Sequence, residues 1–213
     1  MKLETLVVGP FEVNCYLYYN EQNGDGVIID PGADQNRIAN TIEQAGITPK
    51  AILLTHGHGD HIAAVEAVKN QYDLPLYIGA GEEELLRNPS ANVSALVGHP
   101  IVAPDPDVVL ADEQVITVGS ITLRVLATPG HSPGGICYLD ERHNRLFCGD
   151  TLFYGSIGRT DLPGGSTEVL LESIRVKILT LPDQIVCLPG HGPQTTVGAE
   201  RVNNPFLVGD YLA

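Results

Sequence analysis

The segment THGHGDH, residues 55–61, holds four side chains that can bind metal ions: His56, His58, Asp60 and His61. It follows the apolar run AILL, which predicts a buried strand, and its glycines favour a loop over a longer strand. Alternate residues of an extended segment point the same way, so His56 and His58 can bind one ion together. Asp60 and His61 lie further along and can face a second ion. We therefore predict a metal centre at the carboxyl end of a strand.

Three further segments place a polar side chain after a predicted strand, between glycines or prolines. His131 lies in TPGHSPG, Asp150 in CGDT and His191 in LPGHGP. A single histidine in a loop is usually a surface residue, but five of the seven histidines of the chain lie in such loops. We therefore interpret the five as one constellation and the other two, His99 and His143, as surface residues.

The elements that must position these side chains alternate between strands and helices. The apolar and β-branched runs, with their turn residues, predict strands and helices in two similar halves. Asp34 and Asp60 are the candidate N-caps of the first two helices. The predicted strands are 3–8, 13–19, 27–30, 51–55, 76–78, 108–110, 115–118, 121–126, 135–139, 145–148 and 184–188. The predicted helices are 34–46, one beginning near 62–68, 82–87, 167–179 and 196–202, and 88–106 is predicted to be a loop.

Runs of strands followed by a helix and another strand occur twice in this order. That pattern predicts an α/β protein with two sheets packed back to back and helices outside, a four-layer αββα sandwich. No low-complexity segment or linker divides the chain, so we predict one domain spanning residues 1–213.

Composition limits the classes of function. The 213 residues are 43% hydrophobic and 18% charged, which is typical of a globular protein. The formal net charge of −14 argues against a nucleic-acid partner. No apolar run is long enough to span a membrane, and the N-terminal MKLE does not resemble a signal peptide. The four cysteines form no Cys-x-x-Cys pair, which favours a reducing cytoplasm.

The motif HxHxDH, followed by Gly-His, Gly-Asp and Gly-His, resembles the metallo-β-lactamase superfamily over nearly all of the chain. The resemblance implies the αββα fold and a dinuclear metal centre at an edge of the sandwich. The ligands it implies are His56, His58, His131 and Asp150 for the first metal, and Asp60, His61, His191 and the bridging Asp150 for the second. Asp150 stands where true β-lactamases typically carry cysteine, and this variant is similar to the hydroxyacylglutathione hydrolase (glyoxalase II) branch.

Such a centre has a definite chemistry. Two dications roughly 3.5–4 Å apart can share a bridging water and lower its pKa to about 7, which provides hydroxide at neutral pH. Asp60 is expected to orient this water as well as to bind metal. Asp60, Asp150 and hydroxide leave a net positive charge on the site, which favours an anionic substrate. Imidazole and carboxylate ligands suit two zinc ions, with iron or manganese as alternatives, and Cys148 is favoured as a small buried residue rather than a ligand.

The segment GRTD at 158–161 offers a candidate for substrate binding. Glyoxalase II enzymes carry GKFY at this place, and its lysine and tyrosine contact glutathione in that family. Arg159 keeps the positive charge, whereas Asp161 replaces the tyrosine. Arg159 is therefore either a substrate-binding residue or a structural partner of Asp161.

These observations favour a metal-dependent hydrolase that acts on a small anionic thioester, S-lactoylglutathione or a related hydroxyacyl thioester, through a bridging hydroxide. A persulfide dioxygenase is an alternative, since the counterparts of His56, His131 and Asp150 would form the facial triad of a single iron. A lactonase with the same seven ligands is another alternative, and a metal-dependent redox or binding module is a non-enzymatic one. The oligomeric state is left open by the sequence.

Overall fold

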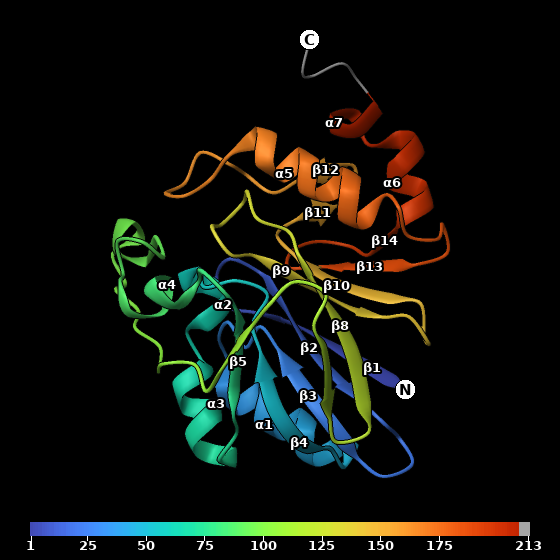
Figure 1. Ribbon diagram of the computed structural model, residues 1–213. Coiled ribbons are helices and arrows are strands. Elements are labelled where there is room, and N and C mark those ends of the chain that lie inside the picture. The colour runs from blue at the N-terminus through green and yellow to red at the C-terminus, as the bar shows by residue number, and fades with distance from the viewer. Residues whose placement is uncertain (209–213) are drawn as a thin grey trace.

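The computed structural model describes residues 1–208, which form two six-stranded sheets packed face to face with helices on their outer faces (Figure 1). In the first sheet, β1 to β3 are antiparallel and β3 to β6 are parallel. Its strands, in spatial order, are β1 (Lys2–Val8), β2 (Val13–Tyr19), β3 (Asp25–Ile29), β4 (Thr48–Leu53), β5 (Leu76–Gly79) and β6 (Val108–Leu110). Residues 209–213, the end of the predicted domain, lie outside the described residues.

The second sheet is antiparallel except where β10 and β13 run parallel. Its strands, in spatial order, are β14 (Thr195–Thr196), β13 (Val186–Pro189), β10 (Arg145–Gly149), β9 (Ile136–Asp140), β8 (Ile121–Ala127) and β7 (Val115–Val118). A separate two-stranded sheet consists of β11 (Leu152–Phe153) and β12 (Ser156–Ile157).

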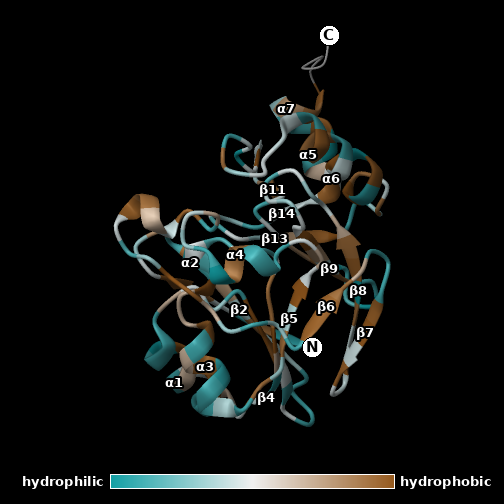
Figure 2. Ribbon diagram, turned by 60° about the vertical axis from the view of Figure 1, so that its left-hand side comes forward, coloured by the Kyte–Doolittle hydropathy of each residue, from teal (hydrophilic) through white to brown (hydrophobic). Residues whose placement is uncertain are grey.

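Helices cover the outer face of each sheet (Figure 1). On the side of the first sheet lie α1 (Gln35–Ala45) and α3 (Val65–Tyr72), whose apolar residues pack on the strands while hydrophilic ones face away (Figure 2). The other elements on that side are α2 (Gly59–Ile62), α4 (Glu83–Arg87) and the short 3₁₀ helix η1 (Ser94–Val97). On the side of the second sheet lie α5 (Thr167–Ser173), its π-helical continuation η2 (Ile174–Ile178), α6 (Val197–Asn203) and α7 (Pro205–Val208).

Three apolar layers hold the four structural layers together. Within β2, Leu17 packs toward the helices of the first sheet, whereas Tyr18 packs between the two sheets with Phe147. Successive strand residues face opposite sides, so a strand buried on both faces is apolar throughout. The third layer joins α5 to the second sheet through residues such as Leu170. This arrangement confirms the predicted αββα sandwich.

Of the two predicted N-caps, Asp34 does lie at the N-cap position of α1, although without a side-chain capping bond, whereas Asp60 does not lie at that of α2. Asp34 precedes α1 in a left-handed conformation, φ 56°, and its carboxylate accepts a hydrogen bond from the Gly9 N–H instead of capping the helix. Asp60 lies inside α2, for which His58 occupies the N-cap position. The helix predicted over 62–68 is divided between α2 and α3, and both Asp60 and His61 belong to the short first helix.

Other elements differ at their ends. The helix predicted over 167–179 changes to π-helical hydrogen bonding at Ile174. The predicted loop 88–106 contains η1, and the pattern gave no sign of β11, β12, β14 or α7. Among residues 1–208 no helix has the length and apolar character needed to cross a bilayer.

Candidate metal centre

The seven predicted ligands lie together at one edge of the sandwich, five of them in loops that follow strands and two in a short helix. His56 and His58 follow β4, Asp60 and His61 belong to α2, and the remaining three follow β8, β10 and β13. In three groups the potential ligand atoms all lie within 4.8 Å of one another. The groups are His56, His58 and His131; His56, His61 and Asp150; and Asp60, His61 and His191.

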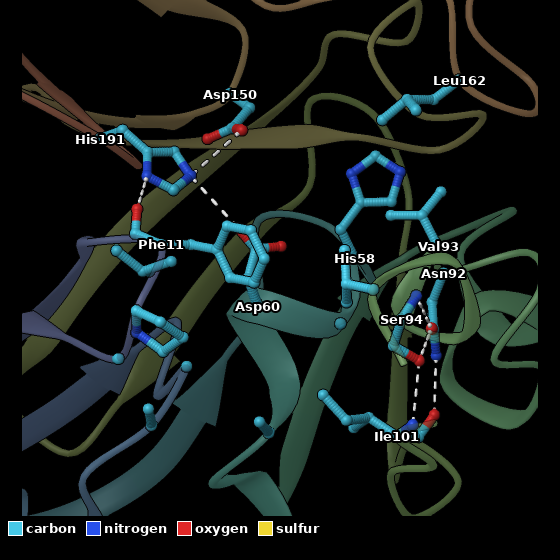
Figure 3. Close-up of a pocket in the computed structure, with 18 of the residues that line it drawn as sticks. Phe11, His58, Asp60, Asn92, Val93, Ser94, Ile101, Asp150, Leu162 and His191 are labelled. Atoms are coloured by element: carbon cyan, nitrogen blue, oxygen red, sulfur yellow. Dashed lines mark hydrogen bonds and ion pairs between the residues drawn. The ribbon is translucent and has the colours of Figure 1, made fainter. Parts of the chain in front are cut away.

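Asp150 lies between the first group and the third. Its Oδ2 is 3.6 Å from Nε2 of His131 and 3.5 Å from Nε2 of His191, and its Oδ1 is 3.4 Å from Nε2 of His61. His191 also lies 3.4 Å from Oδ2 of Asp60 (Figure 3). One carboxylate therefore faces both halves of the centre, which is the geometry that a bridging ligand needs.

Buried polar atoms without a hydrogen bond gather in this centre. Nε2 of His56, Nε2 of His58 and Oδ1 of Asp150 are buried and have no hydrogen-bond partner among the described residues. A buried polar group without a partner is costly, and native proteins have few of them. His58 meets the neighbouring imidazole through its other ring nitrogen, since its Nδ1 lies 2.9 Å from Nε2 of His131. Imidazole nitrogens and carboxylate oxygens gathered in this way fit metal ions that prefer nitrogen and oxygen ligands.

In His131 and His191, the Nδ1 atom makes a hydrogen bond to a backbone carbonyl oxygen. Nδ1 of His131 lies 2.8 Å from the carbonyl oxygen of Arg159, and Nδ1 of His191 lies 2.9 Å from that of Phe11. A carbonyl only accepts, so each Nδ1 carries a proton, and Nε2 is the ring atom that each histidine turns toward the centre. Bonds of this kind fix the orientation of metal-binding histidines.

Asp30 orients His61 in the same way. Its buried carboxylate accepts hydrogen bonds from the backbone N–H and the hydroxyl of Thr55, and its Oδ2 lies 3.1 Å from Nδ1 of His61. The sequence shows Asp30 at the end of an apolar strand, as it shows the predicted ligands, but its spacing does not reveal which histidine it contacts.

The protonation states differ across the centre. Burial, together with neighbouring imidazoles, lowers the pKa of His58 to about 3. Burial also opposes the charged form of His61, but Asp150 and Asp60 outweigh it and raise the pKa of His61 well above its usual value. Burial likewise opposes ionisation of Asp150, and the nearby His61, His56 and His131 nevertheless hold its pKa well below the usual range. The centre thus combines charged and neutral groups, and dications would bind to these groups in place of their protons.

Two glycines allow the chain to approach this centre closely. A Cβ atom added to Gly190 would lie 2.2 Å from Oδ1 of Asp150, and one added to Gly158 would lie 1.8 Å from the carbonyl oxygen of Asp150. Any side chain at either position would displace Asp150. The Gly-His and Gly-Arg pairs of the sequence thus have a steric cause.

Glu82 is a buried residue that the sequence analysis missed. One of its carboxylate oxygens accepts a hydrogen bond of 2.7 Å from the N–H of Gly57, and the other accepts one of 2.6 Å from the N–H of Gly134. Burial raises the pKa of Glu82, and these two N–H groups oppose the shift. Glu82 therefore joins the loop of His56 and His58 to the loop of His131, a contact between segments that local sequence cannot reveal.

The other residues considered in the sequence are Arg159 and His99, which line a cleft beside the centre, and His143 and Cys148, which do not. The guanidinium of Arg159 makes two hydrogen bonds of 2.7 Å to Asp161, and Arg159 also lines a cleft beside the centre. His99 is exposed, as predicted, but lines the same cleft. His143 is exposed and contacts Asp140. Cys148 is buried, burial raises its pKa, and it lies outside the three candidate groups, in line with an apolar role.

The fold and this centre define a class of protein. A model of the metallo-β-lactamase superfamily matches residues 8–191, and the chain therefore belongs to that superfamily. Among curated relatives, a probable metallo-hydrolase of Bacillus subtilis, YqgX, is 41% identical over 98% of this chain and 99% of its own length. The hydroxyacylglutathione hydrolase GloC of Haemophilus influenzae is 36% identical over 97% of this chain and 98% of its own.

Two solved structures are also similar to this chain over nearly its whole length. The BLEG-1 B3 metallo-β-lactamase is 43% identical, with a TM-score of 0.94, over 98% of this chain and all of its own. TTHA1623, solved in a di-iron-bound form, is 36% identical, with a TM-score of 0.86, over 96% of this chain and all of its own. The protein is thus a metal-dependent hydrolase of this superfamily, with candidate imidazole and carboxylate ligands.

Proposed function

We propose that the protein hydrolyses a small thioester, S-lactoylglutathione or a related hydroxyacyl thioester, at two metal ions held by the seven predicted ligands. The observation that carries the proposal is the position of Asp150 between the two histidine groups, together with the buried Nε2 of His56, which has no hydrogen-bond partner among the described residues. The relative GloC, a hydroxyacylglutathione hydrolase, supports the choice of substrate.

Metal ions at such a site lower the pKa of a coordinated water and polarise a carbonyl group. The residues of the chain supply orientation around that chemistry. Oδ2 of Asp60 lies 3.4 Å from Nε2 of His191, and both residues line the cleft, which supports the role that we propose for Asp60 in orienting the attacking water. The backbone carbonyls of Arg159 and Phe11 hold two of the imidazoles in the required tautomer.

A thioester suits this site better than an amide. A departing thiolate is stable without a proton, whereas an amine leaving group needs a general acid. The side chain of Asp60 is 22% exposed, against 11% for Asp150. Burial opposes its ionisation, but His61 and a hydrogen bond from His191 outweigh burial and lower the pKa of Asp60. It is therefore ionised at neutral pH and a poor proton donor.

Two zinc ions are the proposed cofactors, and iron has support from the di-iron form of TTHA1623. Two dications against Asp60 and Asp150 leave the site positive, which would attract a small anionic thioester despite the net charge of −14. The four cysteines are free and buried, which supports the proposed cytoplasmic location.

The test combines metal analysis with turnover. Protein purified without added metal should bind two equivalents of zinc or iron, hydrolyse S-lactoylglutathione and lose activity on chelation. Isolation with one iron and oxidation of glutathione persulfide would instead establish the dioxygenase, and activity on lactones alone would establish the lactonase.

Hydrolysis of a β-lactam is a second candidate, because BLEG-1, described as a B3 metallo-β-lactamase, is 43% identical to the chain. It requires cleavage of an amide, for which the site offers no evident acid among the described residues. A cephalosporin assayed beside S-lactoylglutathione decides between the two, and preferred turnover of the cephalosporin would replace the thioester proposal.

A further inference from the structure

A large cleft opens directly onto the candidate metal centre. Its volume is about 1070 Å³, and His58, Asp60, His131, Asp150 and His191 form its floor. Three segments distant in sequence form its walls, the turn between β1 and β2, the segment 92–101, and the segment 153–162. Figure 3 shows Phe11 beside His191, with Val93, Ile101 and Leu162 on the side of His58.

The walls are apolar, and much of that apolar surface is exposed. Leu96 is 75% exposed, Phe11 50% and Val97 48%. All three line this one cleft, together with Val8, Val93 and Leu162. Exposed apolar side chains that gather in a concave site, rather than being scattered, mark a surface that is covered when a ligand binds.

Three polar side chains in the walls, those of Asn92, Ser94 and Arg159, make hydrogen bonds within the protein. Asn92 donates hydrogen bonds to the carbonyl oxygens of Leu85 and Ile101. The Ser94 hydroxyl donates to Oδ1 of Asn92 and accepts from the N–H of Ile101. The guanidinium of Arg159 likewise donates two hydrogen bonds to the carboxylate of Asp161. Asn92 and Ser94 therefore add little polar recognition to the cleft, whereas Arg159, 62% exposed at its side chain, and the exposed His99 remain accessible to a ligand.

We infer that, among thioesters, this site prefers an acyl group with an apolar part, alkyl or aryl, that is larger than a lactoyl group and packs against Phe11, Leu96 and Val97. The inference rests on the proposed thioesterase function. Thiols such as glutathione carry several charged and polar groups, so the apolar part of such a thioester is its acyl half. The walls match that half, because the reacting carbonyl must lie on the floor beside the metal ligands and the acyl chain extends from it.

Thioesters that share one leaving group test the inference. The metal-loaded protein is assayed with the acetyl, butyryl and hexanoyl thioesters of N-acetylcysteamine, which differ only in the acyl chain. A methylene group buried from water contributes about fourfold to binding. We therefore expect kcat/KM for the hexanoyl thioester to exceed that for the acetyl thioester by at least tenfold.

Variants locate the subsite. Leu96→Ser and Phe11→Ser should lower kcat/KM for the hexanoyl thioester several-fold more than for the acetyl thioester. Both positions are exposed, so the fold should tolerate the changes. Val202→Ser is the matched control, since Val202 is 69% exposed on α6 and lies outside the cleft. An equal loss on both substrates in the Leu96 and Phe11 variants would overturn the assignment.

A binding measurement separates this inference from the proposed function. Hydroxamates chelate metal ions, and calorimetry compares acetohydroxamate with hexanohydroxamate on the metal-loaded protein. If no thioester is hydrolysed but hexanohydroxamate binds at least tenfold more tightly, the thioesterase function fails and the apolar subsite stands. If thioesters are hydrolysed without any dependence on chain length in rate or affinity, the function stands and the apolar acyl group is ruled out. If no thioester is hydrolysed and hydroxamate binding does not depend on chain length, both the thioesterase function and the apolar subsite are rejected.

Discussion

Asp150 is the residue on which the two halves of the candidate centre depend. Its Oδ2 lies within 3.6 Å of imidazoles from both halves, whereas Asp60 contacts the His191 side alone. We expect Asp150→Ala to lose both metal equivalents on gel filtration, and Asp60→Ala to lose one. Metal content by emission spectrometry measures this. Retention of one equivalent at wild-type affinity by Asp150→Ala would show that Asp150 does not bridge.

His61 couples metal binding to pH. Burial disfavours its charged form, but Asp150 and Asp60 raise its pKa well above the usual value, so it holds a proton at neutral pH in the metal-free protein. A histidine must lose that proton to bind metal. Metal affinity should therefore rise with pH, by up to about tenfold per unit, until the pKa of His61 is passed. Competition titrations at pH 6, 7 and 8 measure the slope, and pH-independent affinity would contradict the protonated state.

Arg159 is paired with Asp161 but remains 62% exposed at its side chain, and it lines the cleft. If it binds the carboxylates of a glutathione thioester, Arg159→Ala should raise KM by the equivalent of roughly 1–3 kcal/mol, the range for a hydrogen bond to a charged group. The kcat should change less, because the contact is remote from the carbonyl.

Asp161→Asn frees the guanidinium and should lower KM for the same substrate. An uncharged thioester of N-acetylcysteamine is the control and should show neither effect. An unchanged KM in Arg159→Ala would leave Arg159 as a partner of Asp161 and as the residue whose carbonyl orients His131.

At the scale of elements, Glu82 connects two loops that carry ligands. It precedes α4 and accepts hydrogen bonds from the N–H groups of Gly57 and Gly134. Glu82→Gln keeps the volume but turns an amide N–H₂ toward one of these donors. We expect it to weaken the site of His56, His58 and His131 by about 10- to 100-fold, the usual effect of losing a contact that orients ligands.

Cobalt titration monitored by absorption separates the two sites in this variant. Affinity of the site formed by Asp60, His61 and His191 should change much less. Glu84→Ala, an exposed change on α4, is the control. A lower melting temperature with equal affinity at both sites would reduce Glu82 to a structural residue.

The metal ligands were predictable from the sequence, whereas other parts of the site were not. The seven candidate ligands were predictable because the segments that hold them follow apolar strands and contain glycines or prolines, and the structure brings all seven together. The cap predicted at Asp60 is wrong because α2 begins one residue earlier and directs Asp60 toward His191. Glu82 and the cleft were not predictable, because both depend on segments that meet only in the folded chain.

At the scale of the molecule, the candidate centre lies where the two halves of the sandwich meet. The first half supplies His56, His58, Asp60 and His61, and the second supplies His131, Asp150 and His191. Other bonds cross the same junction, since the hydroxyl of Tyr16 donates to the carbonyl oxygen of Pro189 at 2.7 Å and the N–H of Asn14 donates to that of Gly190. Metal ions would therefore crosslink two sheets that are already in contact.

Removal of metal should consequently destabilise the whole fold. A ligand that binds only the native state at about 1,000 times its Kd adds about 4 kcal/mol to the free energy of unfolding. For a domain of this size, 1 kcal/mol corresponds to about 2–4 °C in Tm, so chelation should lower Tm by roughly 8–16 °C. Scanning calorimetry of the metal-loaded and chelated protein measures the shift, and readdition of zinc should restore it. Asp150→Ala, which we expect to bind no metal, should show no further shift with chelator. An equal Tm for loaded and metal-free wild-type protein would contradict a crosslink between the sheets.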